Sequence, residues 1–314
     1  MKETVIVIAG PTASGKSGLG IELAKKINGI IISADSMQIY KGLDVGTAKV
    51  IPGEAQGIKH ELIDIVDIHE KFSVSEYKDM CYAKIDEILA LGKTPIIVGG
   101  TGLYINAIVN NMKFEKIDDE KEKQAEKELF NLTYGKTSEE LYELLKTMDA
   151  KAAENIESGN DKRVIRAIKL NLLGIKKSDI ESRNDLWKKN ESEYNFLVVY
   201  IDMPRDLLYD RINSRVDKML DMGIMDEVKL LYEYNNEDIT ACQAIGYKEF
   251  FEYLDGSKNL EECVELLKQK TRNYAKRQIT WFKKLQDKLI VDGTKTKEEI
   301  IESILKEYNE KNKC

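Results

Sequence analysis

The stretch GPTASGKS occupies residues 10–17, directly after an apolar, β-branched run at residues 4–9. It matches G-x-x-x-x-G-K-[ST], the pattern of a phosphate-binding loop. The residues that follow it are apolar at helical spacing, with Leu19, Leu23 and Ile27 on one side. The segment therefore has the strand–loop–helix order that such a loop requires, and it predicts an anion site where the first strand meets the first helix.

The chemistry of this loop follows from its backbone. Successive N–H groups of residues 13–17, at a helix N-terminus, form a concave site for an anion. Lys16 adds a positive charge, and the Ser17 hydroxyl can ligate Mg²⁺. We therefore expect a polyphosphate to be held by Gly10, Thr12, Ala13, Ser14, Gly15, Lys16 and Ser17. The alternative is a glycine-rich turn that binds nothing.

Further apolar runs extend the α/β pattern along the chain. Strands are expected at residues 30–33, 62–66, 94–98, 196–201 and 288–292, with an amphipathic helix at 75–91. Between residues 113 and 193 the charge is dense and the periodicity is helical. We predict an α/β fold of the P-loop NTPase-like class, a doubly wound parallel sheet formed by residues 1–112 and 194–314. Residues 113–193 are predicted to form an inserted, mostly helical subdomain.

Composition narrows the class of protein. The chain has 314 residues, 42% of them hydrophobic, and no apolar run approaches a membrane span. Because the N-terminus enters a strand at once, we expect no signal peptide and no membrane anchor. The four cysteines form no C-x-x-C pair, so we expect a cytoplasmic protein. A net charge of −7 argues against non-specific nucleic-acid binding by the whole surface, but it leaves room for a local basic patch.

The phosphate chemistry differs from that of the common nucleotide hydrolases. ATPases and GTPases normally carry an acidic residue at the end of a second buried strand, where it holds Mg²⁺. Here the best candidate strand, 94–98, ends in Gly-Gly-Thr-Gly at residues 99–102. A guanine-reading Thr/Asn-Lys-x-Asp motif is also absent from the sequence. Both observations disfavour a motor or a GTP-dependent switch.

Asp35 is the acidic residue that is better placed, because it ends the second predicted strand beside the phosphate loop. A carboxylate there can accept a proton from a nucleophile that attacks the bound ligand. Alternatively, it caps a helix or lies near Mg²⁺ without binding it. Arg211 and Arg215, one helical turn apart, either form a lid over the phosphates or belong to a solvated helix face.

Two basic segments stand out in this acidic chain. Residues 268–284 carry seven basic residues and no acidic one, with Tyr274, Trp281 and Phe282 interleaved. Residues 162–169 place Lys162, Arg166 and Lys169 near one helix face. Such segments suit an RNA backbone and stacked bases, and the alternative is ordinary charged surface. His60 and His69 lie in no metal-ligand spacing and receive no role.

Taken together, the motifs resemble one family, the bacterial tRNA dimethylallyltransferases, over nearly the whole chain. The matching blocks are GPTASGKS (10–17), DSMQIYKGLDVGTAK (35–49), LIDIVD (62–67), GGTGLY (99–104), RVIRAIK (163–169), RVDKMLDMGIMDEV (215–228), QAIGYKE (243–249) and TRNYAKRQITWF (271–282). Lys162 and Lys59 depart from residues that are usual in the family, a Gln and a His. Neither departure touches the expected chemistry.

The resemblance implies a reaction and a set of roles. Dimethylallyl diphosphate would occupy the phosphate loop with Mg²⁺, and its dimethylallyl group would pass to N6 of the adenine at tRNA position 37, next to the anticodon. Asp35 would act as general base, Arg215 would neutralise the leaving diphosphate, and Thr101 would contact the adenine or the diphosphate. Contacts with the anticodon stem-loop of tRNA are expected from Asp35, Ser36, Met37, Gln38, Thr101, Lys123, Lys162, Arg163, Arg166, Arg272, Lys276 and Arg277. We also expect a monomer.

Two other classes stay open from the residues alone. A P-loop kinase would use the same loop, Asp35 and an arginine lid to pass phosphoryl from ATP to a hydroxyl group. A nucleotide-gated RNA-binding switch would need a nucleotide-sensing carboxylate or a guanine motif.

Overall fold

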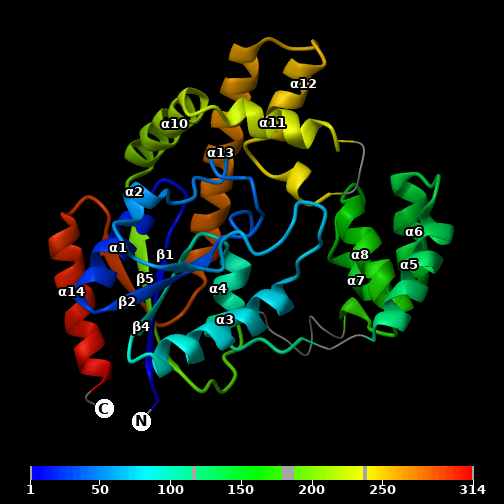
Figure 1. Cartoon of the computed structure of the whole chain (residues 1–314). Helices are drawn as coiled ribbons and strands as arrows, with labels where there is room; N and C mark the ends of the chain where they lie inside the picture. The colour runs from blue at the N-terminus through cyan, green and yellow to red at the C-terminus, as the bar shows by residue number, and fades with distance from the viewer. Residues whose placement is uncertain (1, 115–117, 179–186, 236–238, 313–314) are drawn as a thin grey trace. The chain divides into compact units, whose positions relative to one another are not determined.

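Six parallel strands form one sheet, in the order β3-β2-β4-β1-β5-β6. The computed structural model describes residues 2–114, 118–178, 187–235 and 239–312. The chain divides into two units: residues 1–111 with 190–314, which contain the sheet, and residues 112–189. The insert expected from the sequence spans 113–193. The predicted parallel, doubly wound sheet is confirmed, and Figure 1 shows its strands between helices.

The strand bounds follow the apolar runs with one exception. The strands are β1 Thr4–Ala9, β2 Gly29–Ala34, β3 His60–Glu61, β4 Thr94–Gly99, β5 Asn195–Asp202 and β6 Lys288–Asp292. The strand expected at residues 62–66 is wrong. Leu62 and Asp64 have positive φ angles of 60° and 55°, which extended strands do not allow. The segment instead crosses to a neighbouring loop, where Val66 forms an isolated bridge with Tyr40.

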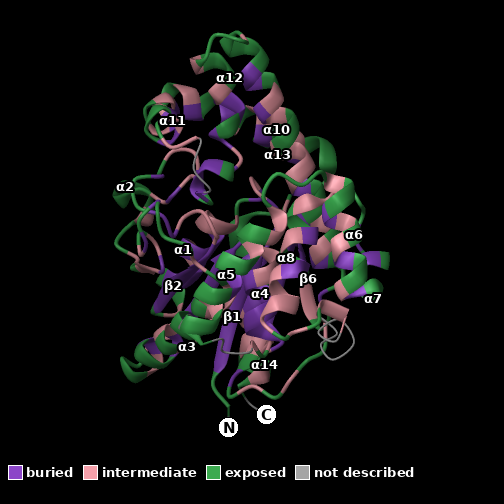
Figure 2. Ribbon diagram, turned by 90° about the vertical axis from the view of Figure 1, so that its right-hand side faces the viewer, coloured by how far each residue is buried: buried purple, intermediate pink, exposed green. Residues whose placement is uncertain are grey.

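The inner strands are buried on both faces, which explains their nearly continuous β-branched sequences. All six residues of β1 and of β2 are buried, and Figure 2 shows these strands in purple. Helices α1 (Lys16–Lys26) and α14 (Lys297–Lys311) pack on one face through a cluster that includes Ile8, Leu23 and Ile301. On the other face, Tyr77 of α3 (Val74–Ala90) donates a hydrogen bond to Ser33 O, and Phe282 of α13 (Leu260–Lys283) contacts Tyr200.

A second hydrophobic cluster of the same unit is helical. It joins the segment 39–43 to α11 (Ile224–Tyr232), Tyr247 and Phe250, and the first turns of α13 (Leu260–Lys283). Helix α13 has 24 residues, about 36 Å of helix, so it runs from this cluster to the sheet. The remaining helical elements of this unit are α2 Pro52–Ala55, α4 Gly102–Val109, α10 Arg205–Asp221, α12 Phe251–Leu254, and the 3₁₀ turns Ala241–Gln243 and Lys248–Phe250.

The other unit contains α5 Asp119–Thr133, α6 Ser138–Met148, α7 Ala150–Glu154 and α8 Asp161–Leu172. These helices share a small core that includes Leu145, Val164 and Ile168. Within the described part of the chain, no helix is long and apolar enough to cross a membrane.

Candidate active site

The site lies at the carboxyl edge of the sheet, where β1, β2 and β4 end side by side. The strand order reverses here, because β1 connects to β2 on one side of the sheet and the later strands β5 and β6 lie on the other. Ligands of open α/β sheets bind in the crevice at such a reversal. A pocket at this edge is lined by residues from all three strand ends and from two distant helices: Thr12, Lys16, Ser17, Asp35, Gln38, Val98, Gly99, Arg215, Tyr274 and Gln278.

The phosphate loop folds into the expected turn. Ala13 and Gly15 have positive φ angles of 62° and 87°, and Gly15 lies directly before α1. The Lys16 ammonium donates to the Pro11 carbonyl at 3.3 Å, so its chain curls back over the loop. The buried Ser14 hydroxyl oxygen has no hydrogen-bond partner. A loop with positively charged and unsatisfied donors is suited to an anion.

Gln278 of α13 holds this loop from the other end of the chain. Its side-chain oxygen accepts from Thr12 N at 2.9 Å, and its amide donates to Gly100 O at 2.8 Å. The side chain is 5% exposed. One buried amide thus joins the phosphate loop to the end of β4. Gln278 lies in the block TRNYAKRQITWF (271–282), where no role was predicted for it, although Tyr274, Gln278 and Trp281 share one helix face by their spacing.

The glycines after β4 are required by the same packing. A Cβ on Gly99 would lie 2.1 Å from Ala34 O, and one on Gly100 would lie 2.5 Å from the Gln278 amide nitrogen. A Cβ on Gly102 would lie 2.3 Å from the Trp281 ring. No side chain fits at these distances, so the Gly-Gly-Thr-Gly segment and α13 need each other to pack.

Asp35 and Thr101 meet at the ends of β2 and β4. Thr101 N donates to Ala34 O at 3.1 Å, and the Thr101 hydroxyl accepts from Ser36 N at 2.9 Å. One carboxylate oxygen of Asp35 accepts from Met37 N at 3.0 Å. This contact makes Asp35 the first residue of a tight turn. The carboxylate still lines the pocket beside Lys16, so Asp35 meets the geometric requirement for a base near a ligand of the loop.

Two cations converge on the loop. Arg215 of α10 donates to the Thr12 hydroxyl at 3.0 Å, and Arg211, one turn earlier, reaches within 3.9 Å of where a Cβ on Gly15 would lie. Removal from water, and then the charge of Arg215, lower the pKa of Lys16 to about 8, although the Asp35 carboxylate opposes the shift. Burial likewise lowers the pKa of Arg215. Three positively charged side chains, Lys16, Arg211 and Arg215, therefore lie close together at the loop, as in a site that binds an anion.

The basic stretch of α13 is less free than its sequence suggests. Lys268 pairs with Asp217 at 2.9 Å and with Glu265 at 3.1 Å. The Arg272 guanidinium donates to the Asn213 side chain at 2.6 Å. Lys276 and Arg277 are exposed and lie over the rings of Tyr209 and Tyr274.

The other predicted tRNA contacts belong to the helical unit. Lys162, Arg163 and Arg166 lie at exposed positions of α8, and Lys123 is exposed on α5. Lys169, which the helix spacing placed near them, pairs with Glu122 at 2.8 Å and Glu126 at 2.9 Å.

Comparison with known proteins identifies the family. A family model described as IPP transferase matches residues 38–285. The chain belongs to the IPP transferase family. The tRNA dimethylallyltransferase of Acetivibrio thermocellus is 49% identical over 288 residues, which cover 91% of this chain and 90% of that protein. The tRNA dimethylallyltransferase of Finegoldia magna is 46% identical, over 92% of this chain and 90% of that protein.

Solved IPP transferases share the fold. The crystal structure of tRNA delta(2)-isopentenylpyrophosphate transferase from Staphylococcus epidermidis is 42% identical with a TM-score of 0.71, and the match covers 99% of this chain and 100% of that one. A eukaryotic dimethylallyltransferase captured acting on tRNA is 32% identical with a TM-score of 0.75, over 93% of this chain and 74% of that one. The chain therefore has relatives named for prenyl transfer rather than for phosphoryl transfer, and the kinase alternative loses support.

Proposed function

We propose that this protein transfers a dimethylallyl group from dimethylallyl diphosphate to N6 of the adenine at tRNA position 37, with release of diphosphate. One observation carries the proposal. In a chain of the IPP transferase family, Asp35, Lys16 and Arg215 line one pocket, and β4 ends in glycines where a nucleotide hydrolase would carry its magnesium carboxylate.

The reaction needs a base on one side and positive charge on the other. N6 attacks the allylic carbon, the bond from that carbon to oxygen breaks, and the electron pair leaves with the diphosphate. Because an aromatic amine is a weak nucleophile, Asp35 takes the proton that N6 loses. Negative charge on the diphosphate grows, so the loop N–H groups, Lys16 and Arg215 stabilise the transition state more than the ground state.

The donors present also suit Mg²⁺. This ion prefers oxygen ligands and is commonly held by one or two protein groups together with substrate phosphates. Ser17 and Asp35 offer a hydroxyl and a carboxylate in the pocket, and no cluster of three or more His, Cys, Asp or Glu side chains suited to a metal occurs among the described residues. We propose Ser17 as the protein ligand. When bound, Mg²⁺ would neutralise charge on the diphosphate.

We propose that the anticodon loop is the part of the tRNA that enters the site. A single-stranded loop allows the adenine to leave its stack, which brings N6 within reach of Asp35. Exposed Lys276 and Arg277 of α13, and Lys162, Arg163 and Arg166 of α8, are proposed to contact the RNA backbone. Ser36, Met37 and Thr101 are proposed to border the target nucleotide. A tRNA substrate also supports the expected cytoplasmic location, and we propose a monomer.

The test compares dimethylallyl diphosphate and ATP as ligands of the phosphate loop, and then measures transfer of the dimethylallyl group to RNA. Dimethylallyl diphosphate with Mg²⁺ should raise the unfolding temperature more than ATP with Mg²⁺ does. An anticodon stem-loop with adenine 37 should then gain one dimethylallyl group, and the same RNA with 37 changed to guanine should gain none. Stabilisation by ATP alone, with no prenylated RNA, would overturn the proposal in favour of a kinase.

A further inference from the structure

The loop of residues 40–49 borders the pocket and takes part in none of the chemistry described above. Thr47 and Ala48 line the pocket, yet the segment has no regular secondary structure. Gly42 and Ala48 have positive φ angles of 75° and 47°. Because no helix or strand ladder sets this conformation, other contacts must hold it.

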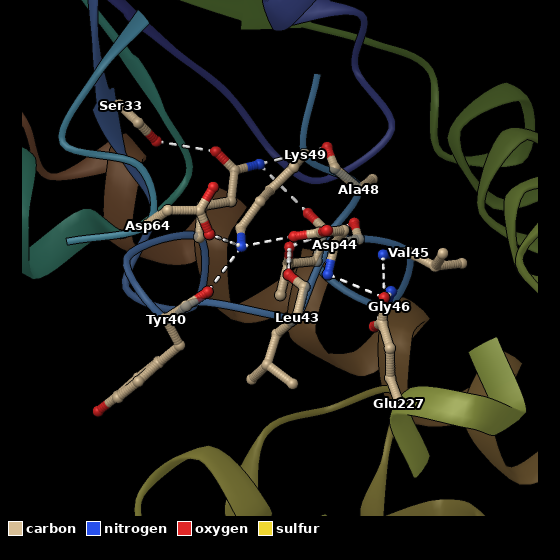
Figure 3. Close-up of polar contacts among 12 residues, drawn as sticks. Ser33, Tyr40, Leu43, Asp44, Val45, Gly46, Ala48, Lys49, Asp64 and Glu227 are labelled. Atoms are coloured by element: carbon tan, nitrogen blue, oxygen red, sulfur yellow. Dashed lines mark hydrogen bonds and ion pairs between the residues drawn. The ribbon is translucent and has the colours of Figure 1, made fainter. Parts of the chain in front are cut away.

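Glu227 of α11 supplies the first of these contacts. Its carboxylate accepts hydrogen bonds from three successive backbone N–H groups: Asp44 at 2.9 Å, Val45 at 2.7 Å and Gly46 at 3.1 Å. Figure 3 shows this carboxylate below the turn that it holds. Hydrogen bonds to a charged acceptor are stronger than neutral ones, so this turn is firmly held from α11.

Tyr247 fixes Glu227 in turn. Its hydroxyl donates to the second carboxylate oxygen at 2.8 Å, and its fully buried ring occupies the space that a Cβ on Gly46 would need, 2.4 Å from the ring carbon Cζ. Burial, and then the charge of Glu227, raise the pKa of Tyr247. The phenol therefore stays protonated and remains a donor.

Lys49, the last residue of the loop, contacts the first residue of the loop and two carboxylates. Its side chain is 5% exposed, and its ammonium contacts Tyr40 O at 2.6 Å and the carboxylates of Asp44, at 2.7 Å, and Asp64 (Figure 3). Glu227 thus holds residues 44–46 in the middle of the loop, and Lys49 joins its two ends through Tyr40 O. The carbonyl groups of the loop therefore have defined directions.

Two of the carbonyl groups of the loop accept hydrogen bonds from Gln38. Its side-chain amide donates to Thr47 O at 3.2 Å and Ala48 O at 3.3 Å, and its side-chain oxygen accepts from the Ser33 hydroxyl at 2.8 Å. Both the nitrogen and the oxygen of the Gln38 amide thus have partners within the protein. Gln38 therefore connects two segments that flank the turn beginning at Asp35: the end of β2 before it and the loop 40–49 after it.

We propose that Glu227 and Tyr247 are positioning residues for Asp35, acting through the loop 40–49 and Gln38. Glu227 and Tyr247 hold the loop, the loop holds the Gln38 amide, and Gln38 holds the turn 35–38 that presents the carboxylate. The inference rests on the proposed function, in which Asp35 is the base.

The test measures prenyl transfer in a single turnover, with enzyme in saturating excess over the anticodon stem-loop. Under this condition the rate constant does not depend on the fraction of enzyme that is folded, so a purely structural defect leaves it unchanged. Glu227→Gln, which keeps the shape and removes the charge, should lower the rate constant about ten-fold, and Tyr247→Phe about three-fold. Asp226→Asn is the matched control, because Asp226 neighbours Glu227 on α11, has a side chain that is 88% exposed, and pairs with Lys229 at 3.5 Å.

A double-mutant cycle identifies the route of the effect. If Glu227 acts through Gln38, Glu227→Gln should slow the Gln38→Ala enzyme by less than two-fold. A full ten-fold slowing on that background, or wild-type rate constants for Glu227→Gln or Gln38→Ala, would overturn the inference and leave the transferase standing. Should Glu227→Gln fail to fold, Tyr247→Phe carries the same cycle with Gln38→Ala. Absence of transfer by the wild-type enzyme would instead refute the proposed function.

Discussion

Replacing Gln278 by alanine would test whether one buried amide joins the phosphate loop to β4. The substitution removes the acceptor of Thr12 N and the donor of Gly100 O. A polar group left without a partner in a buried site costs about 1–3 kcal/mol. Because Gly100 is buried whereas Thr12 is partly accessible to water, the two losses should together lower the free energy of unfolding by about 2–4 kcal/mol.

The effect should be visible in both stability and binding. For a unit of this size, the loss corresponds to a fall of roughly 5–10 °C in Tm. The unfolding transition can be monitored by the fluorescence of Trp281, which lies one turn further along α13. The KM for dimethylallyl diphosphate should rise about ten-fold, the equivalent of about 1.4 kcal/mol, because the loop must then be ordered by the ligand. Gln269→Ala, on an exposed position of the same helix, is the control and should change neither quantity. A Tm and KM within error of wild type for Gln278→Ala would refute the reasoning.

The remaining predictions concern the base, the loop lysine and the RNA surface. Asp35→Asn should leave binding of tRNA and of the allylic diphosphate nearly intact and lower turnover by about 10²–10⁴-fold; near-wild-type turnover would exclude Asp35 as the base. Lys16, with a pKa of about 8 in the free protein, should be mostly neutral at pH 9. A bound anion favours its charged form, so diphosphate binding at pH 9 should take up a proton and weaken as the pH rises further. Calorimetry in two buffers of different ionisation heat measures this uptake, and equal heats would contradict it. Lys276→Glu with Arg277→Glu should weaken tRNA binding and flatten its salt dependence, whereas unchanged affinity at low salt would mean that both residues are ordinary surface.

Much of the fold was predictable because its signals are local. Buried parallel strands need β-branched, apolar runs, and those runs locate β1, β2, β4, β5 and β6 within a few residues. The failed prediction at residues 62–66 shows the limit of that signal. Leu62 and Asp64 adopt positive φ angles there, and Lys49 holds the Asp64 carboxylate from a loop that lies next to it only in the folded chain.

The site was predicted in part for the same reason. Lys16, Ser17, Asp35 and Arg215 were expected, and all four line one pocket. Gln278 received no role, although its spacing to Tyr274 and Trp281 places the three on one helix face. Periodicity says which residues share a face, but it does not say what that face contacts.

The amino-acid sequence by itself determined the chemistry of the phosphate loop, because residues 10–17 carry its donors and its charge within one turn of chain. Only the tertiary structure decided what holds that loop in shape. Its partners Arg215 and Gln278 lie 203 and 266 residues away from Thr12. Glu227 likewise lies 182 residues away from Val45, and the Tyr247 ring packs against Gly46 of the same loop. Such contacts form between surfaces that folding brings together, and their strength depends on burial and direction, which no local pattern encodes.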